Sequence, residues 1–284
     1  MNKIFVGLDI GGTKIMAAAT DDQGNELRRL RVDTPEDLDS GLQTLHSLIS
    51  ELAADGELQG IGAACGGPLD SITGVVSPLH QPEWRSVPLK NIIESRWNCR
   101  FAVDVDTNVA AVGEYNLGRY AERTFLYITL STGMGGGFLI DGKIYQGKGH
   151  PEIAHQSVNF RSQHPERAIC ECGAGACLEA LVSGNGIRRM YLRAAEDLSR
   201  FEWDEVAYNF GQGLRNIAAL LSPDVIVLGG GVAVGGGQAF VNAATEYMRD
   251  GLKIVAIPKL RLSKFGYDTA LLGACWLARS LAKS

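Results

Sequence analysis

The sequence has no surplus of positive charge and no long hydrophobic run. Its 27 lysines and arginines are outnumbered by 32 aspartates and glutamates, which gives a formal net charge of −5. Broad binding to DNA or RNA is therefore disfavoured, because no basic surplus exists to neutralise a phosphate backbone. Apolar runs such as residues 270–278 are much shorter than the roughly 20 residues that a membrane-spanning helix needs. We expect neither a membrane nor a nucleic acid as a partner.

A signal for export is also missing. The apolar run at residues 4–8 ends at Asp9 and is too short for the core of a signal peptide. Cysteine is sparse: of six cysteines, three lie close together and the others are scattered. This distribution is typical of a metal site and ordinary buried thiols rather than of a disulfide framework. We therefore expect a cytoplasmic protein.

Glycine, in contrast, is abundant. It makes up 35 of 284 residues, about 12% against a usual share of about 7%. Glycines at strand ends let a ligand approach the backbone closely, because no side chain blocks it. A chain of this length forms one large domain or two modest ones. The glycines gather at residues 11–12, 66–67, 133–137, 229–231 and 235–237.

The predicted secondary structure has two halves that begin alike, each with a strand, a glycine turn and a second strand. Strands that alternate with helices predict α/β layers with ligands at the carboxyl ends of the strands. The first half has expected strands at residues 3–9, 15–19, 27–32, 60–64 and 101–105, a helix opened by Thr34, Pro35 and Glu36, and a helix at 109–117. The second half has expected strands at 125–130, 138–140, 224–228 and near Leu260, an irregular segment at 141–180, and helices up to Leu221 and at 269–282.

Three glycine motifs follow apolar strands directly and are candidate nucleotide loops. In the first, residues 9–14, Asp9 can hold Mg²⁺ through water, and the Thr13 hydroxyl can face an anion together with backbone N–H groups. The second, residues 129–137, is another candidate phosphate cradle. In the third, residues 227–232, a nucleotide can lie against bare backbone. An ordinary turn explains any one of these loops, whereas three together favour a ligand.

A fourth motif, residues 104–108, ends another apolar strand. A carboxylate of Asp104 or Asp106 at this place can accept a proton from a hydroxyl that attacks a phosphoryl group. Alternatively, Asp106, Thr107 or Asn108 caps the helix that is expected near Val109. The residues alone leave both interpretations open.

The fifth motif combines thiols with an imidazole. Cys170, Cys172 and Cys177 lie in a glycine-rich loop, and three thiolates with one imidazole form a tetrahedral set typical of structural zinc. Free buried thiols are the alternative. The imidazole comes either from His155, 15 residues before Cys170, or from His164, six residues before it.

Together these motifs resemble the ROK family of sugar kinases, a branch of the actin-like ATPases. The resemblance covers nearly the whole chain, and its most specific part is the cysteine block from Cys170 to Glu179, where the family's spacing of four residues between the second and third cysteines is kept. It implies an α/β, actin-like ATPase (ribonuclease H-like) fold of two domains with an active-site cleft between them. The implied domains are a smaller one at residues 1–118, completed by 268–284, and a larger one at 119–267 that carries the zinc-binding loop.

The resemblance also implies ATP-dependent transfer of the γ-phosphoryl group to a hexose or amino-sugar hydroxyl, usually at C6. The implied cofactors are ATP, Mg²⁺ and a structural Zn²⁺, which would hold the loop of Glu179 in place. Asp106 matches the catalytic base. Residues that match ATP and phosphate contacts are Asp9, Gly11, Gly12, Thr13, Lys14, Thr132, Gly133, Gly229, Gly230 and Gly231. Residues that match sugar contacts are Gly67, Asp106, Asn108, Glu152, His155 and Glu179. The matching zinc ligands are His155, Cys170, Cys172 and Cys177, with His164 as the alternative imidazole.

Three departures from the family pattern concern the sugar pocket. Val105 stands where family glucokinases commonly have Asn, Ala154 stands in place of a Gly, and residues 78–82 differ from the usual Pro-Asn-Leu. The patterns around Asp106 and Glu152 resemble the fructokinase-like branch instead, which favours fructose over glucose. Many members of the family dimerise, so a homodimer is also implied, with the helical stretch at residues 186–221 as one surface for it.

Other function classes fit parts of the pattern. A sugar-responsive repressor of the same family carries an additional N-terminal helix-turn-helix, for which a phosphate loop starting at residue 9 leaves no room. A non-catalytic sugar-binding protein is disfavoured by the presence of Asp106. An actin-like ATPase without a sugar substrate is disfavoured by the cysteine block and by Glu152 and His155.

Overall fold

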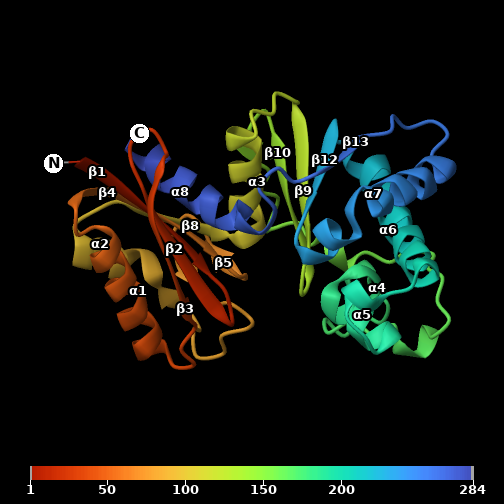
Figure 1. Ribbon diagram of the computed structural model, residues 1–284, viewed down its shortest axis with the longest axis horizontal. Helices are drawn as coiled ribbons and strands as arrows, with labels where there is room; N and C mark the ends of the chain where they lie inside the picture. Colours follow the sequence, from red (N-terminus) through yellow and green to blue (C-terminus); the bar gives the residue numbers. More distant parts are fainter. Residues whose placement is uncertain (1, 283–284) are drawn as a thin grey trace. The chain divides into compact units, whose positions relative to one another are not determined.

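Two five-stranded sheets carry the fold of the computed structural model, which describes residues 2–282 (Figure 1). The chain divides into two compact units, one of Met1–Gly113 with Asp268–Ser284 and one of Glu114–Tyr267. Each unit contains one of the large sheets. Helix α3, Asp106–Leu117, begins in the first unit and ends in the second.

In the first unit, the sheet order is β3-β2-β1-β4-β8. Strand β1 is antiparallel to β2 and parallel to β4, which is in turn parallel to β8. The strands are β1 (Asn2–Ile10), β2 (Lys14–Thr20), β3 (Glu26–Asp33), β4 (Gly56–Cys65) and β8 (Phe101–Val105), and a small sheet adds β5 (Leu69–Asp70), β6 (Val75–Val76) and β7 (Val87–Pro88). The helices besides α3 are α1 (Leu38–Leu52), α2 (Leu89–Trp97) and α8 (Thr269–Leu281).

Small residues let helix α8 lie close to this sheet. A Cβ atom at Gly62 would stand 2.3 Å from the Ala274 carbonyl oxygen, and one at Gly7 would stand 2.6 Å from the Cys275 backbone nitrogen. Larger residues at these positions would push the helix away from the sheet and open voids in the core. Part of the glycine surplus therefore serves helix–sheet packing and not ligand binding.

In the second unit, the sheet order is β11-β10-β9-β12-β13. The strands are β9 (Thr124–Leu130), β10 (Met134–Ile140), β11 (Lys143–Ile144), β12 (Val225–Gly229) and β13 (Lys259–Leu262). The α-helices are α4 (Leu178–Val182), α5 (Gly184–Tyr191), α6 (Arg200–Leu221) and α7 (Gly231–Gly251), and short 3₁₀ turns are η1 (Ile153–His155), η2 (Pro165–Arg167), η3 (Ala195–Asp197) and η4 (Gly266–Asp268). Helices α6 and α7 pack against each other, with the rings of Phe210 and Phe240 stacked at 5.6 Å.

The paired strand–turn–strand openings of the two halves are confirmed, since β1 pairs with β2 and β9 with β10, both antiparallel. The predicted start of the first helix at Thr34 is wrong. Helix α1 begins at Leu38, because the Asp37 carboxylate accepts the Ser40 N–H at 2.8 Å and caps it there. The helix expected from Val109 begins three residues earlier, at Asp106.

Two glycine clusters are placed differently from the sequence prediction. Met134 to Gly137 form the start of strand β10, so the second glycine loop shrinks to a turn at Ser131–Gly133. The cluster at 235–237 lies inside helix α7, where Gly237 has a φ of 59° and kinks the helix. Helices α2 and α7 were not predicted, although apolar residues recur at helical spacing in both: Leu89, Ile92, Ile93 and Trp97 in α2, and Phe240, Val241, Ala244 and Met248 in α7. Among the described residues, no helix has the length and apolarity needed to cross a membrane.

Candidate active site

Three neighbouring parallel strands of the first unit end beside one another. In the register of β1, β4 and β8, Asp9 pairs with Ala64, which pairs with Asp104. The sheet therefore brings Asp9 and the start of helix α3, Asp106, to one edge, together with the segment that follows Cys65. The carboxyl edge of parallel strands is where α/β proteins bind ligands.

The electrostatics agree with this convergence. Burial raises the pKa of the Asp9 carboxyl to about 7, the nearby Asp106 raises it as well, and Lys14 opposes the shift. Burial likewise raises the pKa of the Cys65 thiol to about 12, with further contributions from Asp106 and Asp9. Two carboxylates this close repel each other, so a cation between them would favour ionisation of Asp9.

Asn108, on the first turn of α3, lies beside this edge with only 3% of its surface exposed. Its amide nitrogen donates to Asp104 at 3.1 Å, whereas its side-chain oxygen has no hydrogen-bond partner among residues 2–282. A buried acceptor without a partner costs free energy, and a ligand hydroxyl would satisfy it. Thr107 and Asn108 do not cap α3, because the helix already begins at Asp106, whose carboxylate accepts the Thr107 N–H at 2.7 Å.

The first glycine turn, between β1 and β2, is held by its neighbours in the sheet. The Gly11 N–H donates to the Lys14 carbonyl at 3.1 Å. The Thr34 hydroxyl donates to the Gly11 carbonyl at 2.7 Å, and the Thr34 N–H donates to the Thr13 carbonyl at 3.1 Å. A Cβ atom at Gly12 would stand 2.8 Å from the Cβ atom of His80. Residue 80, one of the departures from the family pattern, therefore lies against this turn.

The third glycine motif separates into three different roles. Gly229 ends β12 against the Tyr127 hydroxyl, and Gly230 has a φ of 83°, which favours glycine at the turn into α7. Gly231 begins the helix, and a Cβ atom there would stand 3.1 Å from the hydroxyl of Tyr267. Tyr267 is 69% exposed. Sequence reasoning missed this aromatic ring, because it lies far along the chain from the loop that it adjoins.

The three thiols of the cysteine block and His155 gather in the second unit. One potential ligand atom from each of His155, Cys170, Cys172 and Cys177 lies within 4.8 Å of the others. The Cys170 sulfur is 3.5 Å from His155 Nδ1, and the sulfurs of Cys172 and Cys177 are 3.5 Å apart. Ligands bonded to one zinc ion at about 2.0–2.3 Å are spaced roughly 3–4 Å apart, so the four atoms suit a tetrahedral site.

Two further predicted residues of this region, His164 and Glu152, are not part of this group of four ligand atoms. His164 faces Glu166, with its Nδ1 atom 3.6 Å from the carboxylate. Glu152 is exposed directly before η1, and its carbonyl accepts the His155 N–H at 3.1 Å. Hydrogen bonding from the Ala174 backbone lowers the pKa of the Cys172 thiol, which favours the thiolate that binds metals.

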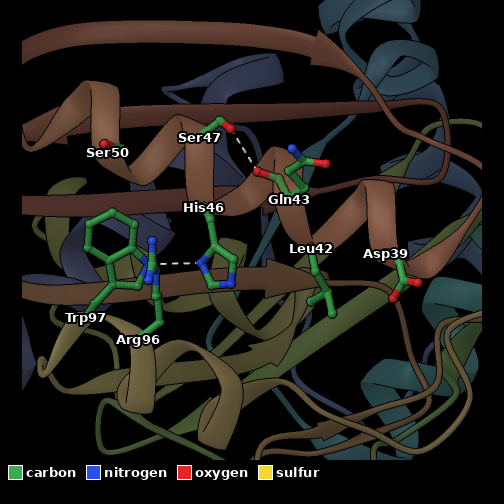
Figure 2. A pocket seen from close by; sticks show the side chains of 8 residues that line it. All are labelled: Asp39, Leu42, Gln43, His46, Ser47, Ser50, Arg96 and Trp97. Carbon is green, nitrogen blue, oxygen red and sulfur yellow. Dashed lines mark hydrogen bonds between the residues drawn. The ribbon is translucent and has the colours of Figure 1, made fainter.

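A separate hollow of about 530 Å³ lies on the first unit between helices α1 and α2 (Figure 2). Two of the side chains that line it are hydrogen-bonded to each other: the Trp97 indole N–H donates to His46 Nδ1 at 3.1 Å. Burial, with the nearby Arg96, lowers the pKa of His46. None of the predicted site residues lines this hollow, whose walls are Asp39, Leu42, Gln43, His46, Ser47, Ser50, Arg96 and Trp97.

The family model described as "ROK family" matches residues 5–281, almost the whole chain. This chain belongs to the ROK family. The fold of the family's kinases is the actin-like ATPase fold, and the mixed α/β architecture of both units agrees with it.

Relatives in the ROK family include kinases of several sugars. An N-acetylgalactosamine kinase of Shewanella sp. is 30% identical over 98% of this chain and 97% of its own length. The structure of a ROK hexokinase from Thermus thermophilus matches with a TM-score of 0.83 and 30% identity, over 99% of both chains. A ROK glucokinase from Streptomyces griseus in complex with glucose and AMPPNP matches with a TM-score of 0.80 and 26% identity, over 98% of this chain and 99% of that one.

Proposed function

We propose that this chain is an ATP-dependent sugar kinase in which Asp106 is the general base. Membership of the ROK family, with full-length likeness to a glucokinase that binds glucose and AMPPNP, supports the reaction class. One observation carries the site: the sheet brings Asp106 to the same edge as Asp9, beside the unpartnered buried oxygen of Asn108. Phosphoryl transfer needs a base, a cation site and a polar pocket for the acceptor.

In the proposed reaction, Asp106 accepts the proton of the sugar hydroxyl, usually the one at C6, as its oxygen bonds to the γ-phosphorus. The bond from phosphorus to the bridging oxygen breaks, and ADP leaves. The backbone N–H groups of Gly12 and Thr13 in the first glycine turn, and of Thr132 and Gly133 in the second, bind the phosphate oxygens, with the Lys14 side chain beside them. Residues Gly229 to Gly231 bind the adenosine part.

We assign the magnesium site to Asp9, with Asp106 as its neighbour. The donor set fits, because a buried carboxylate whose pKa is raised to about 7 gains a counter-charge when a divalent cation is present. When bound, Mg²⁺ neutralises charge on the phosphates. Asp9 would supply the carboxylate that holds this cation.

We further propose that His155, Cys170, Cys172 and Cys177 hold a structural zinc ion. The fit rests on the four ligand atoms within 4.8 Å and on the favoured thiolate of Cys172. His164 is the less suitable imidazole, because it faces Glu166. Bound zinc would fix the irregular segment that carries Glu152 and leads into helix α4.

For the sugar, we assign contacts to six residues: Gly67, Asp106, Asn108, Glu152, His155 and Glu179. Carboxylates, an amide and an imidazole suit the paired hydroxyls of a hexose. Fructose is our preferred substrate, because Val105 removes the amide expected of a glucose pocket. We also propose that the protein is cytoplasmic and that it forms a homodimer. Light scattering can test the homodimer.

The deciding experiment is an ADP-release assay with Mg-ATP and a panel of fructose, glucose, mannose, allose, N-acetylglucosamine, N-acetylgalactosamine and N-acetylmannosamine. Turnover that depends on one sugar supports the kinase and identifies its substrate. ADP release without sugar would favour a plain ATPase instead. If folded, zinc-loaded protein turned over none of the sugars, a sugar-sensing role would replace the kinase.

A further inference from the structure

The second glycine turn, Ser131–Gly133, accepts hydrogen bonds from residues at the start of helix α5. The Gly184 N–H donates to the Ser131 carbonyl at 2.7 Å, and the Asn185 N–H donates to the Thr132 carbonyl at 2.9 Å. Directly after the turn, the Met134 N–H donates to a carboxylate oxygen of Glu179 at 3.0 Å. All three contacts come from the α4–α5 segment, residues 178–191.

The same segment begins at the thiol cluster. Cys177 directly precedes α4, and Glu179 is the second residue of that helix. One carboxylate oxygen of Glu179 contacts the turn, while the other lies 3.8 Å from the Cys170 sulfur. The Leu178 N–H donates to the Gln156 carbonyl at 3.0 Å, which ties the start of α4 to the residue after His155. Both sides of the cluster are thus fixed to the first turn of α4.

Glu179 also leaves little freedom to the turn itself. A Cβ atom at Gly133 would stand 3.1 Å from the carboxylate oxygen that binds Met134. The carboxylate therefore packs directly on the backbone of the turn. A displacement of α4 would move this carboxylate and the Gly184 and Asn185 N–H groups together.

From this geometry we propose that zinc binding at the cluster and nucleotide binding at the Ser131–Gly133 turn are coupled through Glu179. Glu179 is then a positioning residue for the phosphate turn, in addition to its assigned sugar contact. The inference deepens the proposed kinase function and rests on it. Coupling between two binding sites is reciprocal, so bound nucleotide must raise the zinc affinity by the factor by which zinc raises the nucleotide affinity.

The test measures zinc affinity of the full chain by equilibrium competition with a zinc-selective chelating dye, with and without Mg-AMPPNP and without sugar. We expect saturating Mg-AMPPNP to raise the zinc affinity at least about five-fold, the lower end of typical coupling between sites. In Glu179→Ala the increase should fall below about two-fold. Glu171→Ala is the matched control, because this exposed carboxylate of the same loop binds Arg189 at 2.9 Å instead of the turn.

Two results would overturn the proposal in distinguishable ways. If Mg-AMPPNP binds, as measured by calorimetry, and the zinc affinity stays the same, the coupling is absent while the kinase proposal stands. If Mg-AMPPNP does not bind the zinc-loaded protein at all, the proposed function fails and the coupling fails with it. Equal coupling in Glu179→Ala and the unchanged chain would assign the effect to other contacts and reject Glu179.

Discussion

The two hairpin turns of this protein have similar local structure and different support. The turn at Gly11–Thr13 is held by Thr34, which directly follows the adjacent strand β3. The turn at Ser131–Gly133 is held by the α4–α5 segment next to four potential zinc ligands. A regular sheet stabilises the first turn, so its geometry needs no metal. The second depends on a short helix that follows an irregular loop.

This difference divides the proposed active site into two regions. The sheet-held region contains Asp9, Asp106 and the turn at Gly11–Thr13, and the region that the proposed zinc would hold, called metal-held below, contains Glu152, His155, Glu179 and the turn at Ser131–Gly133. Asp9 and Asp106 are fixed by neighbouring strands with a continuous apolar core. Glu152, His155 and Glu179 lie on or beside a segment that has little regular structure from residue 145 to 177. Loss of metal should therefore disturb the second group and leave the first in place.

The largest expected effect is on the sheet-held side. Asp106→Asn should lower kcat by about 10²–10⁴-fold, because the variant keeps the shape of the side chain and loses the proton acceptor. The KM for the sugar should change only a few-fold, and steady-state kinetics measure both. Asp70→Asn, an exposed carboxylate in the same unit, is the control. A kcat close to the original value in Asp106→Asn would reject the base assignment.

Loss of one thiol should act on the metal-held side. Cys172→Ser should remove most of the bound zinc, and a loss of about 2 kcal/mol in stability would lower the Tm by roughly 4–8 °C in a chain of this size. Elemental analysis and thermal unfolding measure the two effects. The control is Cys99→Ser, a half-buried thiol of the first unit. Full zinc content with an unchanged Tm would contradict the zinc site.

The sheet-held residues could be predicted because apolar runs mark strands, and parallel strands bring their carboxyl ends to one edge. The strand ends alone predict Asp9 and a carboxylate within residues 104–106, whereas the resemblance to the ROK family assigns Asp106 as the base, and both roles stay predictions. The thiol cluster was found from the short spacing of its cysteines. The imidazole could not be chosen, because His155 and His164 both lie within reach along the chain, and only the folded loop separates them.

Contacts between segments that are distant along the chain could not be predicted from the sequence. Tyr267 contacts Gly231, 36 residues away, and no local sequence pattern indicates this contact. The glycine surplus was read as a sign of ligands, whereas Gly7 and Gly62 make room for helix α8. Whether a glycine makes room for a ligand or for a helix depends on what packs against it in the folded protein, and this cannot be predicted from the sequence alone.

The raised pKa of Asp9 predicts that the stability of the protein changes with pH. A carboxyl whose pKa is raised to about 7 on folding holds its proton longer than in the unfolded chain, so its contribution to stability falls as pH rises from about 4 to 7. Asp9→Asn removes this dependence. The Tm of the variant relative to the original should therefore rise over this range and level off above it.

Thermal unfolding between pH 4 and 8, without nucleotide or divalent cations, measures this difference. Asp21→Asn is the control, because hydrogen bonding to Asn25 lowers the pKa of this exposed carboxyl. Parallel Tm profiles for Asp9→Asn and the original chain would show that Asp9 is already ionised at pH 4–5.

In the second unit, away from the thiol cluster along the chain, Tyr267 offers an exposed ring beside the proposed adenosine loop. Stacking of a base on an aromatic ring contributes about 1–3 kcal/mol, so Tyr267→Ala should raise the KM for ATP about five-fold or more. Tyr267→Phe should keep a KM near the original, because the ring remains. The KM for the sugar should not change in either variant. An unchanged KM for ATP in Tyr267→Ala would exclude the ring from the nucleotide site.

The smallest expected effect tests the independence of the first turn. Thr34→Val removes the hydroxyl that binds the Gly11 carbonyl at 2.7 Å and keeps the N–H that binds Thr13. One hydrogen bond contributes about 1 kcal/mol, so the Tm should fall by roughly 2–4 °C and the KM for ATP should rise a few-fold. Thr34→Ser, which keeps the hydroxyl, is the control.

The zinc affinity of Thr34→Val should equal that of the original chain, because the sheet and not the thiol cluster holds this turn. Competition with the zinc-selective dye, in the absence of nucleotide, measures both affinities. A variant that lost zinc affinity would contradict the division of the site into a sheet-held and a metal-held region. It would mean that a change in the first glycine turn alters the thiol cluster in the absence of a nucleotide.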